Sequence, residues 1–101
     1  MRIVAKKPLL DFFAAHPDAR QPLLAWHEEA SRAKWATPQD IKDRYVSASF
    51  IGNNRVVFNI GGNKYRLVAA VAYWVGIVYV KFIGTHRQYD HIDAATVELE
   101  Q

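Results

Sequence analysis

The chain of 101 residues carries 13 basic and 10 acidic side chains, four histidines and no cysteine, and half of its residues are hydrophobic. This length suits one domain over residues 1–101, and the apolar content is that of a folding sequence. The composition excludes disulfides and thiolate metal sites, and no apolar run approaches the roughly 20 residues that cross a bilayer. Because the N-terminus also lacks the pattern of a secretory signal, we expect a cytoplasmic protein without a membrane anchor.

The first third of the chain predicts helices after a short strand. Residues 2–6 suit the strand, and residues 7–16 form a helical pattern that Pro17 ends, because proline disfavours helix for the residue before it. A second helix lies between Asp18 and Ala36. Its apolar residues recur at spacings of 3, 4 and 3, which predicts a stripe facing the core: Leu23, Trp26, Ala30 and Ala33.

A third, short helix has a clear start signal. Thr37 is a suitable N-cap, Pro38 fits the first helical position, and Asp40 falls three residues after the cap. We expect this helix to reach about Asp43. Helices followed by a β-rich region predict an α+β fold.

From Arg55 to Thr85 the chain is rich in β-branched and aromatic residues interrupted by glycine, which predicts an antiparallel meander. Gly61-Gly62 suits a two-residue hairpin loop that needs positive φ. The pairs that follow from this loop are Ile60 with Asn63, Asn59 with Lys64, and Val57 with Arg66. A second turn, around residues 74–77, closes with two or four loop residues and gives the pairs Tyr79 with Ala72, Lys81 with Ala70, and Thr85 with Arg66.

Because side chains alternate along a strand, these pairs sort the meander into two faces. The apolar face, which helices should cover, holds Val56, Phe58, Ile60, Tyr65, Leu67, Ala69, Val71, Val78, Val80 and Phe82. The other face is half cationic and holds Arg55, Val57, Asn59, Lys64, Arg66, Val68, Tyr79, Lys81 and Thr85.

The distribution of charge singles out this cationic face. Between Arg44 and Gln88 the sequence contains no Asp or Glu, although basic residues are spread through this region. Cations with an aromatic residue among them fit single-stranded nucleic acid, because phosphates bind cations and bases stack on rings. The alternative is an ordinary solvated face, since Lys and Arg are usually exposed.

The segment after the last strand holds the groups that move protons. His86 is placed at the edge of the cationic face beside Arg66, and histidine takes or gives a proton near neutral pH. Tyr89 points the same way if a helical turn begins there. The alternatives are a surface or capping histidine and a tyrosine folded onto the core. No zinc-ligand spacing and no phosphate-binding glycine loop is present. Metal-free RNA cleavage uses such a set, because the RNA brings its own nucleophile in the 2′-hydroxyl.

Two motifs closely resemble the HigB family of bacterial toxin–antitoxin systems: FNIGGNKYRL, residues 58–67, and THRQYD, residues 85–90. The segments RIVAKKPLLDFFAAHPDAR and TPQDIKDRY also match, so the resemblance extends over nearly the whole chain. It implies a RelE-like fold, in which N-terminal helices pack on an antiparallel β-sheet meander with a short C-terminal helix. It also implies an mRNA interferase, an endoribonuclease that needs neither metal nor cofactor and usually acts on the ribosome.

The resemblance further implies roles and partners. Arg66 becomes the cation that stabilises the phosphate, His86 the acid or base, and Tyr89 the aromatic that positions or stacks the nucleotide. A HigA-like helix-turn-helix antitoxin is the implied partner, in a toxin–antitoxin heterotetramer. We expect no acidic residue on the cationic face, so the general base stays unassigned. The residues expected to contact RNA are Arg55, Asn59, Lys64, Tyr79, Lys81 and Arg87.

Two other functions remain open at this point. A non-catalytic module of the same fold would bind RNA or a partner, and its salt-dependent RNA affinity would survive His86→Ala. A pure interaction protein would use the basic face only for an acidic partner segment.

Overall fold

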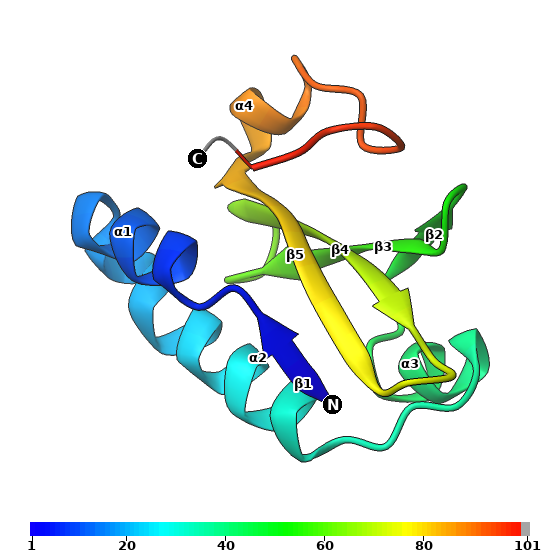
Figure 1. Ribbon diagram of the computed structural model, residues 1–101. Helices are drawn as coiled ribbons and strands as arrows, with labels where there is room; N and C mark the ends of the chain where they lie inside the picture. Colours follow the sequence, from blue (N-terminus) through cyan, green and yellow to red (C-terminus); the bar gives the residue numbers. More distant parts are fainter. Residues whose placement is uncertain (100–101) are drawn as a thin grey trace.

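Five strands form one mixed sheet, with helices packed on it (Figure 1). The computed structural model describes residues 1–99, and the strand order in the sheet is β1-β5-β4-β3-β2. Neighbouring strands are antiparallel, except that β1 runs parallel to β5. In chain order the elements are β1 (Arg2–Val4), α1 (Lys7–Ala15), the 3₁₀ helix η1 (Pro17–Ala19), α2 (Arg20–Arg32), α3 (Pro38–Arg44), β2 (Ser49–Ile51), β3 (Arg55–Ile60), β4 (Tyr65–Ala72), β5 (Ile77–Thr85) and α4 (His86–Tyr89).

This arrangement confirms the α+β class with helices on a sheet and a short C-terminal helix. The short strand expected within residues 2–6 is present as β1, but its pairing with β5 was not predicted, and the edge strand β2 was missed. β2 extends the meander as a further antiparallel strand, and β1 makes the sheet mixed. No helix within residues 1–99 is long and apolar enough to span a membrane.

A local sequence signal determines where α3 begins, whereas α1 and α2 start without a side-chain cap. The predicted cap of α3 is present: the backbone N–H of Asp40 donates to Oγ1 of Thr37 (3.4 Å), and that of Thr37 donates to Oδ2 of Asp40 (3.1 Å). α2 is shorter than the region between Asp18 and Ala36, because η1 precedes it and Arg32 ends it. Ala33 therefore follows the helix and is only half-buried, whereas the rest of the predicted stripe is buried.

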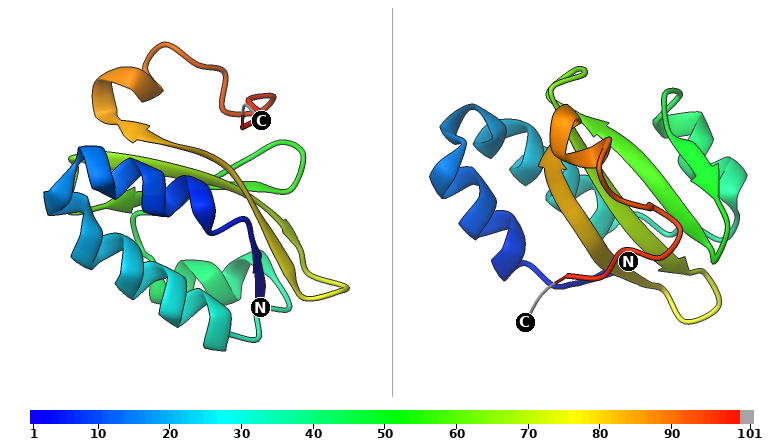
Figure 2. Two further views of the ribbon diagram at one scale, coloured as in Figure 1. Left: turned by 60° about the vertical axis from the view of Figure 1, so that its left-hand side comes forward. Right: turned by 90° about the horizontal axis from the view of Figure 1, so that it is seen from above.

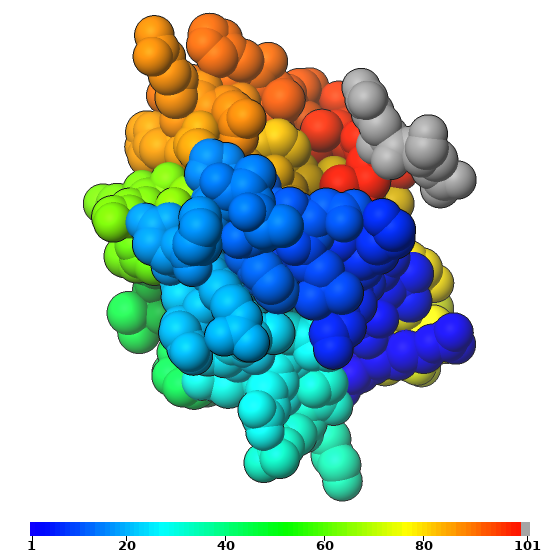
Figure 3. Space-filling model, turned by 90° about the vertical axis from the view of Figure 1, so that its left-hand side faces the viewer, coloured from blue at the N-terminus to red at the C-terminus, as the bar shows by residue number. Residues whose placement is uncertain are grey.

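The helices α1, α2 and α3 cover one face of the sheet, which Figure 2 shows nearly edge-on in its left view. α1 and α2 pack side by side across this face (Figure 3). The core between the two layers confirms the predicted apolar face except at Phe82. Its buried strand residues are Val56, Phe58, Ile60, Tyr65, Leu67, Ala69, Val71, Val78 and Val80.

Both predicted hairpin registers are wrong by two residues. The first loop comprises residues 61–64, so Ile60 pairs with Tyr65 and Asn59 pairs with Arg66. The two glycines do adopt positive φ, 63° at Gly61 and 69° at Gly62, but two further residues complete the loop. The second loop likewise comprises residues 73–76. A shift of two residues preserves the face on which each side chain lies, because the side-chain period of a strand is two.

A β-bulge in β5 reverses the faces of the residues that follow it. Val80 pairs with Ala69 and Phe82 pairs with Val68, which leaves Lys81 as the extra residue. Phe82 therefore moves off the predicted apolar face, and Thr85 moves off the cationic face to pair with Tyr65. The strand sequence does not show the bulge, because apolar residues flank Lys81 on both sides and fit either register.

α4 confirms the helical turn expected at His86. Its cap is reciprocal: the backbone N–H of Gln88 donates to Oγ1 of Thr85 (3.1 Å), and the backbone N–H of Thr85 donates to Oε1 of Gln88 (2.8 Å). Residues 90–99, here called the C-terminal segment, follow without regular secondary structure. They run over the sheet face opposite the helices (Figures 1 and 2).

Candidate functional site

The sheet face opposite the helices, here called the outer face, contains three rows of residues that lie side by side on β3, β4 and β5. One row is Asn59, Arg66 and Gly84; the next is Val57, Val68 and Phe82; the third is Arg55, Ala70 and Tyr79. The first row lies next to α4, which begins where β5 ends. The C-terminal segment contacts the third row.

The backbones of Arg66 and His86 lie near each other at the α4 end of the outer face. Arg66 is half-buried, and its Nη1 donates to the carbonyl oxygens of Asn63 (3.1 Å) and Tyr65 (3.3 Å). The backbone N–H of His86 donates to the carbonyl oxygen of Lys64 at 3.0 Å. This bond fixes the start of α4 against the residues that lead into the strand of Arg66. The backbone of His86 and the strand that carries Arg66 therefore meet at one end of the sheet.

Asp90 lies beside His86, one helical turn further along the chain. Its Oδ2 is 3.4 Å from Nδ1 of the imidazole, and both side chains are more than half exposed. A carboxylate next to Nδ1 favours a ring orientation in which Nε2 is free to face a substrate. The sequence contained the signal for this pair, the spacing of four residues, but the outer face was expected to lack an acid.

Two aromatic rings continue the site next to Arg66. The ring centroids of Phe82 and Tyr89 are 6.4 Å apart, with 54° between the ring planes. Gly84 makes room for them, because a Cβ at this position would lie 2.5 Å from Cζ of Phe82. Half-buried rings beside a cation offer a stacking surface for a base. Sequence reasoning missed Phe82, since only the bulge brings it to this face.

Three of the expected RNA contacts lie near this end of the sheet. Asn59 is half-buried opposite Arg66, and Arg87 is exposed on α4. Lys64 lies in the loop and not on the outer face: its Nζ pairs with Oδ2 of Asp18 in η1 at 3.1 Å. The hydroxyl of Tyr65 donates to the same carboxylate, and this bond, followed by the one from Lys64, lowers the pKa of Asp18.

The other three expected contacts, Arg55, Tyr79 and Lys81, lie where the C-terminal segment meets the sheet. Nη2 of Arg55 and Nζ of Lys81 donate to the two oxygens of Glu98 at 2.9 and 2.8 Å. The hydrogen bond from Lys81 is the main reason why the pKa of Glu98 is lowered. Lys81 also lies 5.7 Å from the ring centroid of Tyr79. The expectation of an acid-free cationic face is therefore wrong, because Glu98 reaches it from the end of the chain.

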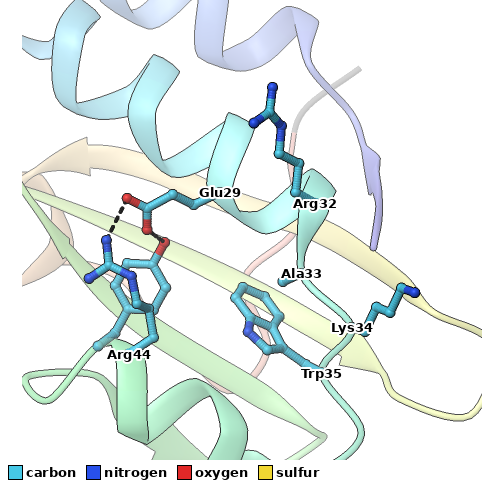
Figure 4. A pocket seen from close by; sticks show the side chains of 7 residues that line it. Glu29, Arg32, Ala33, Lys34, Trp35 and Arg44 are labelled. Atoms are coloured by element: carbon cyan, nitrogen blue, oxygen red, sulfur yellow. Dashed lines mark hydrogen bonds and ion pairs between the residues drawn. The ribbon is translucent and has the colours of Figure 1, made fainter.

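A separate hollow of about 440 Å³ lies between the end of α2 and α3 (Figure 4). Its single carboxylate, Glu29, accepts from Nη2 of Arg44 (2.7 Å) and from the hydroxyl of Tyr45 (2.8 Å). Burial, followed by the bond to Glu29, raises the pKa of Tyr45. None of the residues expected at the functional site lines this hollow. Within residues 1–99, no three His, Asp or Glu side chains gather closely enough to hold a metal ion.

Comparisons with known proteins identify the family. The model of the HigB toxin family, described as the RelE-like toxic component of a toxin–antitoxin system, matches residues 19–92, which include Arg66, His86 and Tyr89. The chain is 27% identical over 96 residues to the mRNA interferase toxin HigB of Escherichia coli (strain K12), covering 93% of this chain and 92% of the relative. The mRNA interferase HigB of Shigella flexneri matches to the same extent, and that of Escherichia coli O6:H1 is 23% identical over 94 residues, or 91% of each chain. The chain therefore belongs to the HigB family of RelE-like toxins.

Proposed function

We propose that this chain is an endoribonuclease that cleaves mRNA in the cytoplasm as the toxin of a toxin–antitoxin pair. The names of its relatives, mRNA interferases, support this class of activity. The observation that carries the assignment to particular residues is the 3.0 Å bond from the backbone of His86 to Lys64, which holds His86 next to the strand of Arg66. Metal-independent RNA cleavage needs a proton-transferring group and a phosphate-binding cation in this relation.

In the proposed reaction the 2′-hydroxyl oxygen attacks the adjacent phosphorus, and the bond from phosphorus to the 5′-oxygen of the next nucleotide breaks. Arg66 binds the phosphoryl oxygens and stabilises the negative charge that grows on them. His86 transfers a proton at one of two atoms: it takes the proton of the 2′-hydroxyl or gives one to the departing 5′-oxygen. The products are a 2′,3′-cyclic phosphate and a 5′-hydroxyl end.

The neighbouring residues position the imidazole and the nucleotide in this scheme. Asp90 orients the ring of His86 through Nδ1. Tyr89 and Phe82 hold a base by stacking, and Asn59 and Arg87 contact the backbone of the RNA.

The remaining parts of the proposal concern the setting of the reaction. Membership of a toxin family implies an antitoxin partner. We assign this partner to the HigA-like helix-turn-helix type, in a toxin–antitoxin heterotetramer, and we place the cleavage on translating ribosomes. These assignments rest on the family resemblance.

The test is cleavage of a defined mRNA in a reconstituted translation reaction, mapped by primer extension, with and without ribosomes. Wild type is compared with Arg66→Ala and His86→Ala, and His91→Ala serves as the matched control for loss of an exposed histidine. Loss of a general acid or base slows cleavage by about 10²-fold or more, so His86→Ala should show this effect and His91→Ala should not. Cuts that require translation would support ribosome dependence.

Two results would count against the proposal. A folded His86→Ala protein that cleaves as fast as wild type removes His86 from the mechanism. A wild-type protein that binds RNA but leaves every message intact is a non-catalytic binding module.

A further inference from the structure

We propose that Arg55 and Lys81 form a second anion subsite, which binds a backbone phosphate of the RNA after displacing Glu98. In the structure the carboxylate of Glu98 fills this subsite, so the C-terminal segment acts as an intramolecular cover. The inference rests on the proposed function, because it extends the path of the RNA from the His86 end along the outer face.

Arg55 is buried but incompletely hydrogen-bonded. It is 7% exposed, and its Nη1 donates to the carbonyl oxygens of Ala94 (3.0 Å) and Val97 (2.6 Å). Its Nη2 reaches Glu98, yet its Nε has no acceptor among residues 1–99 although it is buried. A buried N–H without an acceptor is unfavourable. The cover therefore leaves part of this guanidinium unsatisfied.

Glu98 accepts from only some of the donors at this subsite, and a phosphodiester can accept from more of them. Its two free oxygens fit the planar fork of a guanidinium, so one phosphate can accept from both Nε and Nη2. Glu98 offers one oxygen to Arg55 (2.9 Å) and the other to Lys81 (2.8 Å), and it carries the same single negative charge. Replacing the carboxylate by a phosphate therefore conserves the charge at the subsite and gives Nε an acceptor.

The cover is held weakly at its charged end. The side chain of Glu98 is 59% exposed, so water competes for both of its ion pairs. The C-terminal segment has no regular secondary structure, and it adds a bond from Nδ2 of Asn53 to the carbonyl oxygen of Ala95 (2.9 Å). Figure 2 shows that it is a single layer of chain over the outer face. Leu99, the residue after Glu98, packs against the core, so displacement of Glu98 involves the part of the segment before Leu99.

The exposed subsite would continue the candidate site along the sheet. Arg55 lies two rows from Arg66, a separation of about 13 Å along the strands. The rings of Phe82 and Tyr79 lie in the second and third rows, and Tyr79 is 38% exposed next to Lys81. A cation at each end, with the ring of Phe82 between them and the ring of Tyr79 in the row of Arg55, suits an extended single strand, whose phosphates and bases alternate.

The test compares Glu98→Gln with Glu28→Gln, each made in a His86→Ala background so that bound RNA is not cut. Glu28 is an equally exposed carboxylate that pairs with Arg32 on α2, so its loss controls for the change in net charge. The probe is a fluorescein-labelled single-stranded RNA of about 12 nucleotides, the length range of one such binding surface. Its anisotropy is measured over a series of salt concentrations.

We expect Glu98→Gln to bind the RNA about 5-fold more tightly than Glu28→Gln, as removal of a weak competing ion pair predicts. Its log–log salt slope should be steeper by about 0.7, the contribution of one further phosphate of a single strand. Adding Lys81→Ala to Glu98→Gln should abolish both gains.

Each of the other outcomes overturns a defined part. Equal affinity of the two Gln variants overturns the subsite but leaves the proposed function intact, because cleavage by the His86-containing protein is measured separately. If Glu98→Gln binds RNA more tightly but the His86-containing protein never cleaves RNA, the subsite stands and the proposed function is overturned. Failure of every variant to bind RNA at low salt also overturns the subsite, while the separate cleavage measurement still decides the proposed function.

Discussion

At the scale of single residues, the candidate site depends on a missing side chain as much as on those present. Gly84 lies between Arg66 and the start of α4 and is buried. Its φ is not in the left-handed region, so the constraint is space and not backbone conformation. The ring of Phe82 and the Oε1 of Gln88, which caps α4, fill the volume that a Cβ would occupy.

Gly84→Ala should therefore disturb both the aromatic pair and the cap of α4. The new methyl would meet Cζ of Phe82 at 2.5 Å and Oε1 of Gln88 at 2.9 Å, so both side chains must move. We expect a loss of about 1–3 kcal/mol in the free energy of unfolding, the range for overpacked sites, measured by urea denaturation. Gly52→Ala is the control, because nothing lies within 4 Å of a Cβ there and its φ is ordinary. Equal stability of the two variants would show that the ring of Phe82 does not pack tightly against Gly84.

At the scale of elements, the sequence predicted what local chemistry determines and missed what depends on partners far along the chain. The predicted cap at Thr37 follows from residues within three positions and is present, and the cap at Thr85, which was not predicted, is equally local. Hairpin register depends on how a loop packs, so the Gly61-Gly62 signal located the turn but gave two loop residues too few. The bulge at Lys81 has no local signature at all.

The junction between η1 and β4 is one such long-range contact, and its stability should depend on pH. Hydrogen bonds from Tyr65 and then Lys64 lower the pKa of Asp18 below 3.8 in the folded state. A carboxylate whose pKa is lowered by folding stabilises the protein fully at pH values above its pKa in the unfolded state. This stabilisation is lost as the pH falls through its pKa in the folded state. The bond to Asp18 raises the pKa of Tyr65 above 10.0, so this contribution holds below pH 10.0 and is lost as the pH rises further.

We therefore expect wild type to be more stable than Asp18→Asn between about pH 4 and pH 10, with the difference shrinking outside this window. Thermal unfolding over a pH series measures the difference. Asp11→Asn, which removes an exposed carboxylate paired with Lys7 on α1, should show a smaller difference in the same window. A gap between wild type and Asp18→Asn that stays constant down to pH 2 would contradict this role of the carboxylate.

At the scale of the whole molecule, the two sheet faces have different roles, and this division followed largely from the sequence. Alternation of apolar and polar residues in β3 and β4 was enough to assign the core face, and the shift of two residues in register did not change it. The charge of the outer face was not predictable in the same way. Its expected lack of acids held for residues 45–87, but Glu98 returns to it from the C-terminus. The approach of β1 to β5 is a similar contact between distant segments.

The final prediction tests which face of the molecule binds RNA. Each phosphate contacted by a cation contributes about 0.7 to the slope of log affinity against log salt for a single strand. Arg66→Ala should therefore lower this slope by about that amount. Arg20→Ala removes the same charge from an exposed position at the start of α2, on the helical layer, and should leave the slope nearly unchanged. Fluorescence anisotropy with a single-stranded RNA, in the His86→Ala background, measures both slopes on folded proteins. Equal slopes for the two variants would mean that the RNA does not distinguish the outer face from the helical one, and the assignment of Arg66 to the phosphate would fail with it.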